Sequence, residues 1–78
     1  MSFSELKEYI NTRRDIEFEY KGIKCSISNS SDGYIFAEFN NSDSIKIFST
    51  PQELINKVCI RNKSLEEICE EFICIEVF

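Results

Sequence analysis

Hydrophobic and polar residues alternate strictly from Asp15 to Tyr20, and this period of two is typical of a β-strand. Lys21-Gly22 follows as a two-residue turn, in which the glycine supplies a positive φ. The turn predicts a hairpin whose cross-strand pairs on one face are all apolar: Tyr20–Ile23, Phe18–Cys25 and Ile16–Ile27. On the other face the same register predicts polar pairs: Glu19–Lys24 and Glu17–Ser26. Both faces favour one register, so the apolar face is predicted to be the core.

The next turn leads to a third strand, and its length decides which residues of that strand enter the core. Ser31-Asp32-Gly33 suits a three-residue loop that ends in a glycine bulge. This loop predicts the following pairs: Cys25–Phe39, Ile27–Ala37 and Asn29–Ile35. A two-residue Asp32-Gly33 turn would reverse the faces and bury Glu38, so we favour the longer loop, with Ile35, Ala37 and Phe39 in the core.

A polar turn over residues 40–44 precedes a fourth strand that ends at Ser49. Its register keeps the core apolar by pairing Phe39 with Ile45 and Ala37 with Ile47. On the outer face the same register predicts an ion pair and an aromatic pair: Glu38–Lys46 and Phe36–Phe48. The stretch 15–49 is therefore predicted to be a four-stranded antiparallel meander, with Tyr34, Phe36 and Phe48 on its outer face.

Helices are predicted where a Ser or Thr is followed three residues later by Glu, the pattern of a capping box. Three such pairs occur: Ser2–Glu5, Thr50–Glu53 and Ser64–Glu67. Residues 73–78 alternate again and predict a final strand. The element order is α-β-β-β-β-α-α-β, which we interpret as one α+β domain over residues 1–78 with its helices mainly on one sheet face.

Composition excludes several classes of protein. The chain has 78 residues, 42% of them hydrophobic, and no apolar run long enough to span a membrane. Its four cysteines form no CxxC pair and there is no histidine, so we expect reduced, buried thiols and neither a metal nor a cofactor. The first nine residues lack the apolar region of a signal peptide, which favours a cytoplasmic protein.

Charge is distributed unevenly along the chain. The net charge is −5, yet residues 1–63 hold nine acids and nine bases and are neutral. Residues 64–78 hold five acids and no base, and four of these acids lie in the third predicted helix: Glu66, Glu67, Glu70 and Glu71. This helix presents either an ordinary solvated face or an anionic surface for a basic partner. The acidic balance argues against direct binding to nucleic acid.

Two further clusters are candidates for function. The aromatic side chains of Tyr34, Phe36 and Phe48 predict a partner or homodimer interface, unless another part of the chain covers them. The row of Asp15, Glu17 and Glu19 is interpreted as a solvated strand face rather than a cation site. No serine or cysteine has a candidate base nearby in the sequence, so we expect no enzymatic activity.

The run Arg13–Ile27 and the later run Ser49–Leu54 resemble small uncharacterised proteins encoded in Gram-positive bacterial and phage genomes. The resemblance spans most of the chain, but its motifs are a hairpin and a capped helix, so it implies no functional residues. Short acidic proteins of this kind include phage inhibitors of host defence such as anti-CRISPR proteins.

The sequence thus leads to two functional hypotheses. The first is a non-enzymatic binding protein that occupies or inhibits a partner protein, with a nucleic-acid-handling complex as the favoured target. It would act by acidic mimicry through the third helix or through the outer sheet face. The alternative is a bacterial regulatory or scaffold module that forms a homodimer through Tyr34, Phe36 and Phe48.

Overall fold

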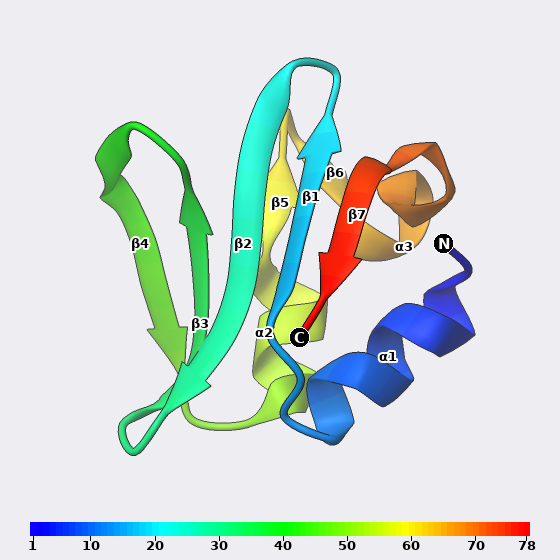
Figure 1. Cartoon of the computed structure of the whole chain (residues 1–78). Helices are drawn as coiled ribbons and strands as arrows, with labels where there is room; N and C mark the ends of the chain where they lie inside the picture. Colours follow the sequence, from blue (N-terminus) through cyan, green and yellow to red (C-terminus); the bar gives the residue numbers. More distant parts are fainter.

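The computed structural model describes all 78 residues and has an α+β fold (Figure 1). Four helical segments lie along the chain: α1 (Phe3–Asn11), α2 (Pro51–Lys57), α3 (Leu65–Ile68) and the 3₁₀ helix η1 (Cys69–Glu71). The strands are β1 (Ile16–Tyr20), β2 (Ile23–Ser30), β3 (Gly33–Glu38), β4 (Asn41–Phe48), β5 (Cys59–Ile60), β6 (Lys63–Ser64) and β7 (Ile73–Val77).

The main sheet is antiparallel and has the strand order β4-β3-β2-β1-β7. The predicted four-stranded meander and the added C-terminal strand are therefore confirmed. A second, small hairpin joins β5 and β6, between the second and third predicted helices, where no strand was predicted. Its turn residues Arg61 and Asn62 have φ values of 53° and 65°, as a two-residue hairpin turn of type I′ requires.

The helices cover one face of the sheet, which we call the inner face. In Figure 1 the opposite face is turned towards the reader, and α2, α3 and the small hairpin lie behind the strands. Seventeen buried hydrophobic residues form a single core between the inner face and the helices. Phe72 is central to it: its ring stacks on Phe18 with centroids 3.9 Å apart and meets the Tyr20 ring edge-on at 6.2 Å. These contacts attach the segment before β7 to the inner face of β1.

The first hairpin has the predicted register in every pair, from Ile16 opposite Ile27 to Tyr20 opposite Ile23. Its inward side chains are fully or almost fully buried, except Ile23 beside the turn, which is partly buried. Alternation and a two-residue glycine turn were sufficient here because both faces required the same pairing.

The second hairpin differs from the prediction by one residue. Its loop is Ser31-Asp32, with Ser30 opposite Gly33, so Phe36 lies opposite Ile27. A shift of one residue exchanges the two faces of a strand. Tyr34 and Phe36 are therefore core residues, 8% and 3% exposed. The expected places of these two aromatics on the outer face, and of Ile35, Ala37 and Phe39 in the core, were wrong.

Glu38 explains why the shorter loop is tolerated. It does turn to the inner side, opposite Cys25, but it lies at the end of β3 and is only half-buried. Its backbone N–H donates to Ser44 Oγ at 2.8 Å. The penalty expected for burying this carboxylate is thus avoided, because strand length places it at the rim of the core.

The register between β3 and β4 also differs from the prediction. Tyr34 lies opposite Phe48 and Phe36 opposite Lys46, so the predicted Phe36–Phe48 and Glu38–Lys46 pairs do not form. The pairing is irregular between Phe36 and Glu38 because the chain turns tightly at Asn40, whose φ is 64°. The polar residues after this turn form a bulged start to β4 rather than an open loop.

Burial of the cysteines was predicted correctly for only two of the four. All four thiols are free, but Cys59 and Cys74 are exposed. Helix α2 ends at Lys57, so Cys59 lies on the small hairpin instead of the helix. Cys74 has a φ of 54° where the pairing between β1 and β7 is irregular, and this bulge also leaves its neighbour Ile73 exposed. None of the helices is both long and apolar enough to cross a membrane.

The second hairpin yields a test of the register. Gly33 has a φ of 141°, and a Cβ atom there would lie 2.3 Å from the carbonyl oxygen of Phe48. We expect Gly33→Ala to lower the free energy of unfolding by roughly 2 kcal/mol or more, because it combines backbone strain with a backbone clash. Urea denaturation measures the change.

Gly22→Ala is the matched control. Gly22 also has a positive φ, 83°, but an added Cβ would meet no atom within 4 Å. Its cost should be about 1 kcal/mol, the ordinary penalty for a left-handed residue. Equal losses in the two variants would contradict the close approach of Gly33 to β4.

Candidate functional site

The outer face of the main sheet is not covered by a helix (Figure 1). Strand alternation and the observed registers define the side chains that share it. They are Glu17 and Glu19 of β1, Lys24, Ser26 and Ser28 of β2, Ile35 and Ala37 of β3, Phe39 just beyond β3, Ile45 and Ile47 of β4, and Ile73 and Glu76 of β7.

An apolar patch occupies the β3–β4 half of this face. We define it by five residues: Ile35, Ala37, Phe39, Ile45 and Ile47. Ile35 and Ile47 are direct cross-strand partners. Phe39, Ile45 and Ile47 are 45%, 54% and 55% exposed. Scattered exposed hydrophobic residues are normal on a protein, but a contiguous group on one sheet face is typical of a contact surface.

A carboxylate cluster occupies the β1–β7 half of the same face. It consists of Glu17, Glu19 and Glu76, and Glu17 lies directly opposite Glu76. Like charges at opposed positions of an antiparallel pair are destabilising. Lys24 is opposite Glu19, but no ion pair within 4.0 Å forms between them. The cluster therefore retains its negative charge and its electrostatic cost.

Two shallow hollows lie over β1, between β2 and the C-terminal segment; the upper hollow is beside Glu19 and the lower hollow beside Asp15. The upper hollow is lined by Glu17, Glu19, Lys24, Phe39, Cys74 and Glu76, together with the strand residues Phe18 and Cys25. The lower hollow has Asp15, Glu17, Ser26, Ser28 and Phe78 along its rim. Glu17 contributes to both. Their open shape offers little enclosure to a small molecule, which binding sites normally provide.

The helix α3 and the 3₁₀ helix η1 carry the second candidate surface. The four carboxylates predicted there are all exposed: Glu66, Glu67, Glu70 and Glu71. Glu67 has a structural role, because its Oε1 accepts from the Ser64 backbone N–H at 2.8 Å while Ser64 Oγ accepts from the Glu67 N–H at 3.3 Å. These hydrogen bonds lower the pKa of Glu67, the backbone contribution being the larger. The other three acids have no basic partner within the chain.

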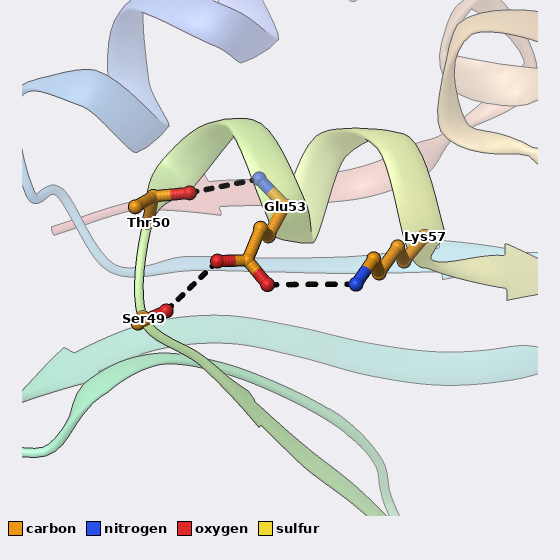
Figure 2. A network of polar contacts seen from close by, with 4 residues as sticks. All are labelled: Ser49, Thr50, Glu53 and Lys57. Atoms are coloured by element: carbon orange, nitrogen blue, oxygen red, sulfur yellow. Dashed lines mark hydrogen bonds and ion pairs between the residues drawn. The ribbon is translucent and has the colours of Figure 1, made fainter.

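Ion pairing is sparse in the whole molecule. The one pair within 4.0 Å joins Lys57 Nζ to Glu53 Oε2 at 3.5 Å (Figure 2). The other carboxylate oxygen of Glu53 accepts from the Ser49 hydroxyl at 2.8 Å, and Thr50 caps the helix through the Glu53 N–H. The hydrogen bond from Ser49 is the main reason why the pKa of Glu53 is lowered. This network fixes the start of α2. No other acid of the protein forms an ion pair within 4.0 Å.

The structure separates the predicted partner-binding residues into two groups. Tyr34 and Phe36 are buried in the core and Phe48 is half-buried against it, so the three do not form an exposed aromatic surface. The acids of α3 and η1 are accessible as expected. Sequence reasoning missed the apolar patch, although exposed Ile and Phe residues would have been found by testing the two-residue loop as an equal alternative.

Metal binding and thiol reactivity depend on how the acidic and cysteine side chains are arranged. No group of three or more His, Cys, Asp or Glu residues is arranged to hold a metal ion. Asp15 of the predicted row Asp15, Glu17 and Glu19 has a partner of its own, because its Oδ1 accepts a hydrogen bond from the Asn29 side-chain amide at 3.2 Å. Burial raises the pKa of the Cys25 thiol to about 12, with a further contribution from Glu38, so this cysteine stays protonated at neutral pH.

Comparisons with protein-family models, with curated proteins and with solved structures found no match to this chain.

The α3 capping box provides a pH test. The folded pKa of Glu67 lies below its ordinary value of 4.5, so its stabilising effect is present above that value and is lost as the pH falls through the folded pKa. Ser64→Ala removes the hydroxyl of this motif. We expect the pKa of Glu67, measured by NMR titration of its carboxyl carbon, to rise towards 4.5.

Glu5 is the internal control for this titration. Its pKa is lowered by the equivalent contacts with Ser2 at the start of α1, which the Ser64 substitution does not touch. The pKa of Glu5 should stay unchanged. A parallel rise of both values would show that the change is not local to the α3 cap. No rise at Glu67 would show that the Ser64 hydroxyl does not contribute to its lowered pKa, since the hydrogen bond from the Ser64 backbone N–H is retained in this variant.

Proposed function

We propose that this protein is a small non-enzymatic binding protein that uses the outer face of its sheet to occupy a basic surface of a partner protein. The supporting observation is the uncovered sheet face, on which Phe39, Ile45 and Ile47 lie beside the carboxylates of Glu17, Glu19 and Glu76. Apolar anchors bordered by charge are the usual composition of a protein-binding surface.

The chemistry of this face favours a basic protein over other partners. A net charge of −5 repels nucleic acid, and the shallow hollows give a small molecule little enclosure. A cationic surface would instead relieve the repulsion between Glu17 and Glu76. Basic grooves of this kind are characteristic of proteins that handle nucleic acids, so an inhibitor of such a complex, as in phage defence evasion, is the role that we favour.

The unpaired acids of α3 and η1 support the same role at longer range. Glu66, Glu70 and Glu71 project a negative field without any basic residue after Lys63 to offset it. Such a field accelerates the approach of a basic partner and makes the association rate sensitive to salt. In this proposal the acids of α3 and η1 speed the approach of the partner protein, and the apolar patch makes the tight contact with it.

A capture experiment tests the contact role. Immobilised protein is incubated with extract from bacterial cells, and captured proteins are quantified by mass spectrometry. We expect Phe39→Ser to reduce capture of the specific partner roughly tenfold or more, because truncating a central aromatic anchor has that order of effect. Phe39 is 45% exposed, so the fold should be retained, which a denaturation curve checks.

Charge reversal tests the attraction role separately. Glu70→Lys with Glu71→Lys should slow association with the captured partner and reduce its salt dependence, with little effect on dissociation. The matched control is Glu8→Lys with Asp43→Lys, which makes the same change in net charge at exposed positions elsewhere. The proposal fails if capture survives Phe39→Ser, or if the two double variants behave alike and the wild type shows no dependence on salt.

A further inference from the structure

We infer that the outer face accepts one particular element of its partner, an amphipathic α-helix with an apolar side and a basic side, lying along β2. This inference rests on the proposed function and specifies what the partner must present. It derives from the division of the outer face into two chemically different halves on either side of β2.

The shape of the face suits a helix. Side chains of β2 on this face include Ser26 and Ser28, which lie between Ala37 and Ile35 on one side and the β1 carboxylates on the other. The small side chains of Ser26 and Ser28 keep the surface low on β2, and the hollows lie beside this line, over β1. The distance from β1 to β3 is two strand spacings, about 9.6 Å, which matches the diameter of an α-helix at about 10 Å.

Charge complementarity determines the composition of that helix. One flank of the helix would meet the apolar patch, from Ile35 and Ile47 to Phe39. The other flank would meet Glu17, Glu19 and Glu76, where only Lys24 offers positive charge. Arginine or lysine on that flank would pair with carboxylates that have no ion-pair partner in the free protein.

A second copy of the chain centred on β2 does not complement the whole of this face. A twofold axis that lies over β2 and parallel to the strands would place the apolar patch of each copy over the carboxylates of the other. An axis across the strands would place Glu17, Glu19 and Glu76 over their own symmetry mates. Both arrangements bury charge without a partner or against like charge, which a basic helix avoids.

A synthetic peptide tests this inference directly. The probe is a helix of about 18 residues, roughly 27 Å long, with leucines on one side and arginines on the adjacent side. This length spans the protein, whose extents are 30 × 28 × 23 Å. Binding is measured by fluorescence anisotropy, and its location by backbone amide shifts in NMR spectra of the labelled protein. We expect saturable binding that shifts the amides of Ser26, Ser28 and Ile35.

Variants of the protein assign the two halves of the face. Glu17→Gln with Glu76→Gln should weaken peptide binding about tenfold at low salt, because the charge-assisted contacts are lost. Glu8→Gln with Asp43→Asn removes the same net charge at exposed positions outside both proposed binding surfaces and should leave the affinity within about twofold. Ser26→Tyr, which raises the surface along β2 in a residue type suited to strands, should abolish ordered binding.

Peptide controls separate this inference from the proposed function. A scrambled peptide of the same composition has no apolar side, and equal binding by it would overturn the helix inference. So would amide shifts confined to α3 and η1, or a dimer of the free protein that Phe39→Ser dissociates in sedimentation. None of these results changes the capture experiment, in which loss of the partner on Phe39→Ser supports the protein-binding role independently.

Discussion

The close approach of Gly33 to the carbonyl of Phe48 is the constraint on which the sheet depends. Only a residue without a Cβ fits this contact, and the two-residue loop before it sets the register of β3. That register turns Tyr34 and Phe36 into the core and leaves Ile35, Ala37 and Phe39 on the outer face. The chemical character of both faces is thus a consequence of one turn.

The core closes around the aromatic contacts beneath β1. Phe72 stacks on Phe18 and holds the segment between η1 and β7, so that β7 can pair with β1 as the fifth strand. Arg14 adds a link at the same edge, because its Nε donates to the carbonyl oxygen of Phe78 at 2.6 Å. All three α-helices then serve the inner face. None of these helices covers the other face of the sheet (Figure 1).

Electrostatics reinforces this asymmetry between the faces. The protein carries fourteen acids and nine bases, yet forms one ion pair. Three of its acids accept hydrogen bonds from serines at helix starts, where their depressed pKa values reflect a structural role. The carboxylates on β1 and β7 have no such role, and Glu17 opposite Glu76 raises the energy of the free protein. A surface that carries such repulsion between like charges is stabilised when a partner of opposite charge binds to it.

The sequence alone determined the helix starts, the first hairpin and the fold class. These features follow from local signals: capping pairs, strict alternation and a glycine turn whose two faces agree. It also located the accessible acids of residues 66–71. Tertiary structure decided the faces of β3 and β4, because Ser31-Asp32-Gly33 is compatible with two loop lengths and only packing against Phe48 distinguishes them. It also decided that Cys59 and Cys74 are exposed, since a helix end and a bulge removed them from their periodic positions. The apolar patch beside the carboxylates was therefore visible only after the strands had been paired.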